Sequence, residues 1–205
     1  MIHVSVQIYI IYTQESWLEA KDLAGDIYVD PETYDLIDLF SYGGFLVVIE
    51  EQLVLFEDGL GTIDPVFEVE VQAAGLEADL ASLGYTRDDV DYVIHSHLHR
   101  DHTGWNTYGD ITDPTIEFPN ALHIIQQAEY DYYSSTIELK EDCNWDVVIQ
   151  PLVDSGQIQI ADGAQTLVSS EDGLTRISVL NCSGHTVGHQ CAELSSNDGY
   201  ILFAG

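Results

Sequence analysis

Apolar residues in the first third of the chain fall into short runs that are typical of β-strands. Residues 3–12 are rich in Val, Ile and Tyr, and branched and aromatic side chains of this kind favour strands. The segment 14–43 is irregular and acidic, and Gly43-Gly44 interrupts the pattern before the next apolar run. That run, FLVVIEEQLVLFEDGLG (45–61), predicts two strands that meet near Glu50-Glu51 and end in a glycine turn.

The pattern changes to a helical period between residues 65 and 83, where leucines fall on one face and a glycine follows as the C-terminal cap. These residues are Leu76, Leu80, Leu83 and Gly84. Further strands are predicted at 91–95, 120–126, 174–181, 190–195 and 199–204, and helices at 127–136 and 142–154. Strands interleaved with helices predict a layered α/β fold. We find no repeat or linker, so residues 1–205 are expected to form a single domain.

The charge balance changes this picture of an ordinary enzyme-sized domain. The chain has 36 acidic residues against 5 Lys and Arg, a formal net charge of −31, and the acids are scattered along its whole length. Such a surface either keeps the protein soluble or indicates a halophilic protein, because molar salt shortens the Debye length to about 3 Å and screens the repulsion. We favour the halophilic interpretation. Nucleic acid is not expected as a partner, because phosphate binding needs clustered Lys and Arg.

Cysteines and apolar runs bear on the compartment. Cys143, Cys182 and Cys191 are too few and too oddly numbered for a disulfide framework. The first 13 residues lack a basic leader and a cleavage site, and no apolar run reaches the ~18 residues that a membrane span needs. We therefore expect a reduced, cytoplasmic protein without a membrane partner. A homodimer is compatible with the sequence.

Candidate chemistry is concentrated in the segment HSHLHRDHTGW (95–105). Within it, His97, His99, Asp101 and His102 fit the pattern H-x-H-x-D-H. Two histidines at i and i+2 that leave a strand end point the same way and can bind one metal through imidazole nitrogen. The aspartate and the adjacent histidine can then reach a second metal nearby.

A second cluster, SGHTVGHQ (183–190), supplies His185 on a glycine-rich turn after a predicted strand. The two segments contain six of the eight histidines in the chain. A single histidine is most often a surface or core residue without a partner. An interlocking cluster between a strand and a Thr-Gly turn is instead typical of a metal site.

These motifs resemble the metallo-β-lactamase superfamily. The likeness extends from about residue 45 through LVLFEDGLG, DYVIHSHLHRDHTGWN, FPNALHIIQQAEYDYY, SGHTVGHQ and YILFAG. It implies a four-layer αββα sandwich with metals between the sheet edges. The family roles place His97, His99 and His185 on the first metal, and Asp101 and His102 on the second. The FPNA…QQAEYDYY segment resembles the branch that contains lactonases and related ester and phosphotriester hydrolases.

The sequence departs from the family pattern in two places. The family usually has Asp-Thr-Gly where this chain has Glu57-Asp58-Gly59, so a contact behind the metal ligands is expected to differ. The family also continues after YILFAG with an aspartate that bridges both metals, and later with another histidine, whereas the sequence stops at Gly205. The fold is therefore expected to be incomplete at its C-terminal end.

The resemblance implies metal-assisted hydrolysis, in which a metal-activated water attacks a carbonyl or phosphoryl centre. Asp101 is the expected catalytic residue, which positions that water and moves its proton to the leaving group. Zinc is the expected cofactor, with two ions in the full-length protein, and iron or manganese are alternatives. The favoured small-molecule substrate is a lactone or ester, such as an acyl-homoserine lactone. A thioester hydrolase of the glyoxalase II kind, an iron-dependent sulfur dioxygenase and a non-catalytic metal-binding fragment stay open.

Several residues near the motifs are predicted to be structural: His95, His189, Trp105 and Cys182. Cys182 in particular is expected to be a small buried residue, although a thiolate is also a good zinc ligand. The tyrosines at positions 130, 132 and 133 fall on a predicted helix, where most should pack and one could line the substrate mouth.

Overall fold

The computed structural model describes residues 6–17, 39–61 and 76–205. Its larger sheet has six strands in the order β1-β2-β3-β4-β7-β8. The first three strands are antiparallel neighbours, whereas β3, β4, β7 and β8 run parallel. The strands are β1 (Val6–Trp17), β2 (Leu39–Ile49), β3 (Gln52–Phe56), β4 (Tyr92–Ile94), β7 (Leu122–Gln126) and β8 (Ile158–Ala161).

The apolar run at 45–61 forms β2 and β3 as predicted, with the turn at Glu50 in a left-handed conformation (φ 56°). Successive side chains of a strand point to opposite faces. Accordingly, Val47 and Ile49 pack in one hydrophobic cluster, whereas Leu46 and Val48 pack in another. The run is continuously apolar because both faces of this sheet are covered.

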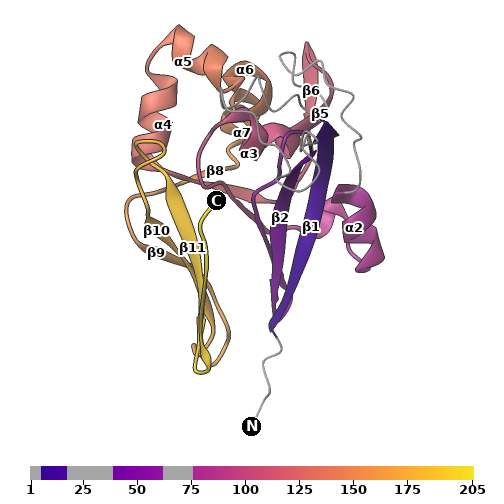
Figure 1. The fold of residues 1–205 in the computed structure, drawn as a ribbon, viewed down its shortest axis with the longest axis vertical. Coiled ribbons are helices and arrows are strands. Elements are labelled where there is room, and N and C mark those ends of the chain that lie inside the picture. The colour runs from indigo at the N-terminus through magenta and orange to yellow at the C-terminus, as the bar shows by residue number, and fades with distance from the viewer. Residues whose placement is uncertain (1–5, 18–38, 62–75) are drawn as a thin grey trace, which may run out of the picture.

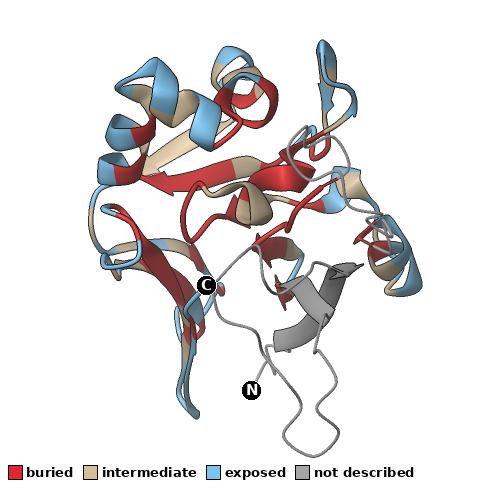
Figure 2. Ribbon diagram, turned by 45° about the horizontal axis from the view of Figure 1, so that its top comes forward, coloured by how far each residue is buried: buried red, intermediate tan, exposed pale blue. Residues whose placement is uncertain are grey.

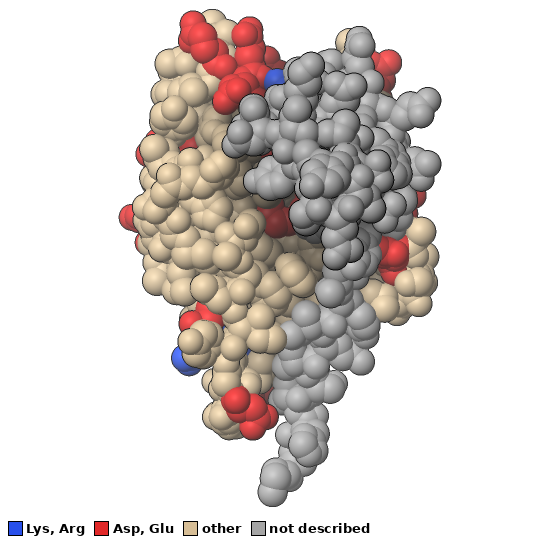
Figure 3. Space-filling model, viewed as in Figure 1, with Lys and Arg blue, Asp and Glu red and all other residues tan. Residues whose placement is uncertain are grey.

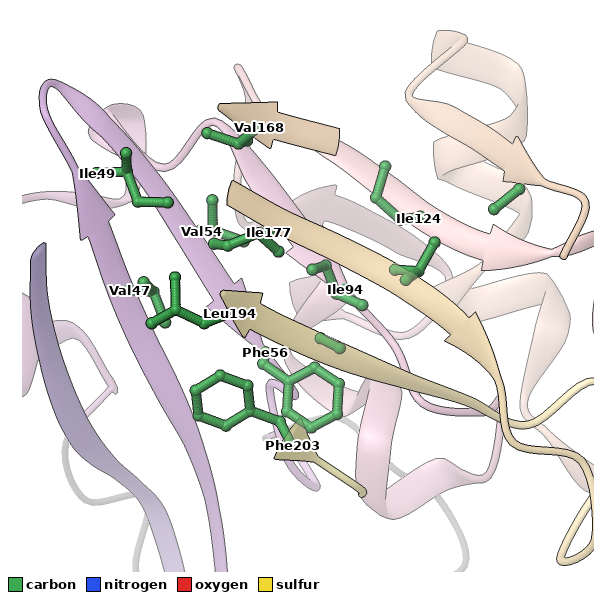
Figure 4. Packing of buried hydrophobic residues seen from close by; sticks show 13 residues of the cluster. Val47, Ile49, Val54, Phe56, Ile94, Ile124, Val168, Ile177, Leu194 and Phe203 are labelled. Atoms are coloured by element: carbon green, nitrogen blue, oxygen red, sulfur yellow. The ribbon is translucent and has the colours of Figure 1, made fainter. Parts of the chain in front are cut away.

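A smaller antiparallel sheet, in the order β12-β11-β10-β9, faces the larger one. Its strands are β9 (Gln165–Ser169), β10 (Arg176–Asn181), β11 (Gln190–Ser196) and β12 (Gly199–Phe203). The cluster between the two sheets includes Val54, Phe56, Ile177, Leu194 and Phe203, whose side chains point toward one another in Figure 4. Buried residues lie where the sheets face each other and also where the helices cover the larger sheet (Figure 2).

Helices cover the other face of the larger sheet, so the mixed α/β fold predicted from the sequence is confirmed (Figure 1). The helices are α2 (Leu76–Ser82), α3 (Arg100–Thr103), α4 (Gln127–Ser134), α5 (Ile137–Asp142), α6 (Trp145–Val148) and α7 (Gln150–Ser155), with 3₁₀ turns η1 (Arg87–Asp89) and η2 (Gly104–Asn106). Within the described part of the chain, no helix lies over the outer face of the smaller sheet, so the fourth layer is not seen there.

Three local predictions differ from the structure. The single helix expected at 142–154 is broken into α6 and α7, because Pro151 lacks the N–H that a continuous helix would use. Gly43-Gly44 does not end the strand, and β2 runs through it from Leu39. Gly44 is needed there because a Cβ would lie 2.2 Å from the carbonyl oxygen of Glu57. The hairpin of β5 (Thr107–Asp110) and β6 (Asp113–Ile116) and the strands β8 and β9 were not predicted.

The C-terminal part of the helix predicted at 65–83 agrees with the structure. Leu76 and Leu80 are buried on α2, and Gly84 follows with a left-handed φ of 86°. Most of the helical prediction before residue 76 lies outside the described residues. Acidic side chains are far more widespread than basic ones on the face that Figure 3 shows. None of the described helices is long and apolar enough to cross a membrane.

Candidate metal centre

The H-x-H-x-D-H segment follows β4 and crosses the upper edge of the larger sheet before entering the short helix α3. His97 is buried (3% exposed), whereas His99 is partly exposed. His185 lies in the loop that joins β10 to β11, the turn of a hairpin in the opposite sheet. The two segments therefore meet from facing sheets, at the edge where those sheets come together.

Three imidazole nitrogens converge at this edge. Nε2 of His97 lies 3.0 Å from Nδ1 of His99, and Nε2 of His185 lies 3.2 Å from the same atom. All three atoms lie within 4.8 Å of one another. Nitrogens bound to one tetrahedral zinc at about 2.0–2.1 Å are separated by roughly 3.3 Å. The donor set and its spacing therefore fit a divalent metal ion.

The pKa shifts of His97 and His99 agree with neutral imidazole ligands. Burial, followed by the neighbouring histidines, lowers the pKa of His97 to about 2. Burial and His185 likewise lower the pKa of His99. Nδ1 of His97 lies 2.8 Å from the hydroxyl oxygen of Ser96, which can accept a hydrogen bond from Nδ1–H and leave the Nε2 lone pair free.

Asp101 and His102 lie beside this triad. The ring of His102 packs 4.1 Å from that of His97, and a carboxylate oxygen of Asp101 lies 3.5 Å from Nε2 of His102. Burial lowers the pKa of His102, but hydrogen bonds to Asp101 and Glu57 outweigh it and raise the pKa to about 10. In the described part of the chain, no third His, Cys, Asp or Glu joins this pair as a metal-binding group.

Glu57 stands where the family usually has the aspartate of Asp-Thr-Gly, and its carboxylate lies behind the histidine segment. Its Oε1 accepts a hydrogen bond from the backbone N–H of Ser96 (2.7 Å), and its Oε2 lies 2.8 Å from Nδ1 of His102. Glu57 has a left-handed backbone (φ 65°), which follows the end of β3 directly. The next residue, Asp58, is fully buried, and its Oδ1 accepts a hydrogen bond from the backbone N–H of Trp105. Neither acid is therefore directed toward the three nitrogens.

Two glycines let the loop after β3 lie directly on the loop after α3. The N–H of Gly104 donates to the carbonyl of Gly59 (2.7 Å). A Cβ on Gly104 would lie 1.8 Å from the carbonyl oxygen of Leu60, and one on Gly61 would lie 2.0 Å from the carbonyl oxygen of Gly104. Close backbone packing therefore explains Gly61 and Gly104, and it holds the loop that follows Glu57 against the loop that follows His102.

Gln190 is a residue that the sequence analysis missed. It is fully buried, and its side-chain amide donates to the carbonyls of His95 (2.7 Å) and Ile124 (2.9 Å). Its backbone N–H donates to the carbonyl of Ser96 (2.8 Å). Gln190, the first residue of β11, therefore links the hairpin to the segment that carries His97. A glutamine at the start of a strand gives no pattern by which this contact could be found.

His95, Trp105 and His189, which were predicted to be structural, pack against or bond to neighbouring residues, whereas Cys182 differs from its prediction. His95 is buried and lies 3.0 Å from both the carbonyl of His102 and Nδ1 of His123. Trp105 packs in the cluster beneath α2, and the ring of His189 stacks on that of His97 at 5.2 Å. Among the tyrosines, Tyr130 packs against Trp145, whereas Tyr132 and Tyr133 line a cavity.

Cys182 is the correction. It is not a free buried thiol but forms a disulfide with Cys191. Cys191 pairs with Leu180 in the β10–β11 ladder, and the N–H of Cys182 donates to the carbonyl of His189 just beyond it. The bond therefore closes the base of the loop that carries His185. The prediction of a fully reduced chain was wrong, and Cys143 is the free cysteine of the described residues.

A cavity of about 550 Å³ opens beside the three nitrogens. It is lined by His99 and His185 together with Tyr132, Tyr133, Asp142, Ser183, Gly184, Thr186 and Val187. Arg100 lies close by, but its guanidinium donates to the carbonyls of Glu141 and Asp142 at the end of α5. Asp101 and His102 face a second cavity of about 560 Å³, which Phe45, Phe56 and Phe203 also line.

The chain is similar to several known proteins. The N-acyl homoserine lactonase AttM of Azorhizobium caulinodans is 42% identical over 72 residues, which cover 35% of this chain and 24% of that protein. A probable metal-dependent hydrolase from Staphylococcus aureus superposes with a TM-score of 0.74 at 18% identity, over 100% of this chain and 74% of that one. AidC, a dizinc quorum-quenching lactonase in complex with a product, superposes with a TM-score of 0.69 at 17% identity, over 98% of this chain and 71% of that one.

The matched segment thus spans about a quarter of the length of the first curated relatives. The family itself is shown by a longer match. Residues 45–205 match the model of the metallo-beta-lactamase superfamily. This range includes His97, His99 and His185 and the loops that support them. This chain belongs to the metallo-β-lactamase superfamily.

Proposed function

We propose that the protein is a metal-dependent hydrolase of neutral lactones and esters, foremost N-acyl homoserine lactones. The observation that carries this proposal is the convergence of His97, His99 and His185 beside a substrate-sized cavity, which His99 and His185 line. The named relatives that are lactonases support it. The chain covers only part of their length, so the whole protein's activity is proposed from the site.

His97, His99 and His185 would hold the first metal ion, and Asp101 and His102 would contribute to a second. Zinc suits three neutral imidazoles, with iron or manganese as alternatives. A bound divalent cation would supply Lewis-acid activation of the substrate carbonyl and of the attacking water. Glu57 accepts a hydrogen bond from the Nδ1–H of His102, so metal binding would displace the Nε2 proton of that ring and use Nε2 as the ligand atom.

Asp101 is proposed as the catalytic residue that handles the proton. Hydrogen bonding and charge from His102 outweigh burial and lower the pKa of Asp101, so its carboxylate is ionised at neutral pH. Its oxygen would accept a proton from the attacking water and deliver it to the alcohol oxygen that leaves when a lactone ring opens. Ring opening turns a neutral substrate into a carboxylate and an alcohol.

The charge around the cavity supports a neutral substrate. Within the described residues, the lining includes the carboxylate of Asp142 but no Lys or Arg. The nearby Arg100 is bound to the end of α5 instead. A glutathione thioester, the substrate of glyoxalase II, carries carboxylates that such a lining would repel. A lactone carries no charge, so this lining would not repel it.

A substrate panel tests this proposal. The zinc-loaded protein should hydrolyse N-hexanoyl-homoserine lactone with a kcat/KM at least tenfold above that for S-lactoylglutathione, and His97→Ala should lose both activities. The iron-loaded protein should consume no oxygen with glutathione persulfide, which separates a lactonase from a sulfur dioxygenase. Tight zinc binding without turnover of any lactone or ester would refute the proposal and favour a non-catalytic metal-binding module.

A further inference from the structure

Glu129 is a buried acid whose carboxylate does not pair with a cation in the contacts that the structure describes. It lies in the first turn of α4 and is 1% exposed. Its Oε1 accepts a hydrogen bond from the backbone N–H of Leu98 (3.1 Å), and its Oε2 accepts one from the N–H of Gly188 (2.9 Å). Burying a carboxylate is unfavourable unless its oxygens are satisfied, so both bonds are needed.

The two donors belong to the two segments that carry the histidine triad. Leu98 lies between His97 and His99, and Gly188 lies in the same hairpin loop as His185. The donors are 31 and 59 residues from Glu129 along the chain. One carboxylate on a third element, α4, therefore holds both ligand segments through their main chains.

The contact between the hairpin loop and α4 is too close for any side chain at position 188. A Cβ on Gly188 would lie 2.2 Å from the backbone nitrogen of Glu129 and 2.6 Å from its Cβ. Gly188 therefore lies directly on the first turn of the helix. The Gly188 N–H and the Glu129 oxygen are held at a fixed distance by backbone packing as well as by the hydrogen bond.

We propose that Glu129 is a positioning residue for the metal centre, which sets the separation of the His97–His99 segment from the His185 loop and thereby the affinity of the site for its metal. The inference rests on the metal centre of the proposed function. It does not depend on the identity of the substrate, because Glu129 touches the ligand segments and is buried away from solvent.

An isosteric amide would break this arrangement. A glutamine side chain has one acceptor oxygen, so it can accept from Leu98 or from Gly188 but not from both. Its amide hydrogens would face the remaining N–H group, which is also a donor. One ligand segment would therefore be released from α4 while the size of the side chain stays the same.

The test is zinc affinity in Glu129→Gln, measured by competition with a chromophoric chelator, alongside the visible absorption spectrum of the cobalt(II)-substituted protein. Loss of a group that orients metal ligands typically weakens binding about 10–100-fold, and we expect a loss in that range with an altered cobalt spectrum. Glu117→Gln is the matched control, since Glu117 is also 1% exposed but pairs with Arg87. The control should keep wild-type affinity within about twofold.

A folded Glu129→Gln variant with wild-type zinc affinity and cobalt spectrum would overturn the inference. If that variant does not fold, Gly188→Ala probes the same contact from the hairpin side and should weaken zinc binding as well, and unchanged affinity there would equally overturn it. A wild-type protein that binds zinc but hydrolyses no lactone would refute the proposed function alone. A wild-type protein that binds no zinc would refute both.

Discussion

Oε2 of Glu57 lies 2.8 Å from Nδ1 of His102, across 45 residues of sequence. The same carboxylate also accepts from Ser96, so it connects the end of β3 to both ends of the H-x-H-x-D-H segment. This contact engages Nδ1 of His102, so Nε2 is the nitrogen left to face a metal. It also shows that a glutamate can reach the position where the family usually has an aspartate.

Glu57→Gln should therefore weaken the second metal position more than the first. The amide cannot serve Ser96 and His102 as two carboxylate oxygens do, so the orientation of the His102 ring is no longer fixed. We expect the weaker step of a zinc titration to lose about 10–100-fold in affinity, with the tighter step changed much less. Calorimetry resolves the two steps, and two unchanged steps would show that Glu57 has no such role.

His97→Ala should remove most of the bound zinc, because His97 is the most buried member of the triad. His189→Gln is the matched control. The ring of His189 stacks on that of His97, but His189 is not among the three converging ligands. Metal content measured after dialysis should fall to near zero in the first variant and stay close to the wild-type value in the second. Equal metal content in both variants would count against the triad.

Glu117 should make stability fall as the pH rises toward 8. Burial raises the pKa of Glu117 to about 7 from 4.5, although the charge of Arg87 opposes this. Between these values the folded protein retains a proton that the unfolded chain has released, so the free energy of unfolding decreases with pH, by up to roughly 3 kcal/mol. Glu117→Gln should raise the Tm at pH 8 and leave it unchanged at pH 4. A Tm equal to the wild-type value at pH 8 would contradict this.

The acidic surface should make stability depend on salt. A net charge of −31 repels itself at low ionic strength, and screening becomes nearly complete at about 1 M salt. We expect the Tm to rise steeply between low salt and about 2 M KCl, and NaCl should act alike because the effect is screening. A flat dependence would mean that the charge serves solubility alone.

Reduction of Cys182–Cys191 should loosen the His185 loop. The disulfide spans nine residues of sequence, and closing a loop of this size stabilises a fold by about 2–3 kcal/mol. The Cys182→Ser/Cys191→Ser variant should lose stability in that range and bind zinc more weakly. Cys143→Ala controls for loss of a cysteine outside the loop, and dithiothreitol should destabilise that control as it does the wild type but leave the double variant unaffected.

The parts of the fold that the sequence predicts are those with a local cause. The continuous apolar run of β2 and β3 follows from burial on both faces, and His97, His99 and His102 lie close together in one short segment. Gly43-Gly44 misled the prediction, because Gly44 is required by a close approach to the backbone of Glu57 and not by a turn. Local residue types cannot reveal such a contact.

The supporting contacts of the site were missed for a related reason. Glu129 and Gln190 are buried polar residues that bond to the main chain of distant segments. Such bonds leave no periodicity and no motif, since the partner is a backbone group that every residue has. The Cys182–Cys191 pairing likewise depends on the register of β10 and β11, which the spacing of the cysteines alone does not determine.

The order in which the chain is made gives the contact between Gln190 and His95 a further meaning. The two residues are 95 positions apart, and His99 and His185 are 86 apart. During synthesis the H-x-H-x-D-H segment therefore leaves the ribosome long before its third ligand does. Contacts between residues so far apart in the sequence slow folding, and zinc capture by all three histidines would report on the docking of the second sheet. A nascent chain that ends before residue 185 would carry an open, two-histidine chelator.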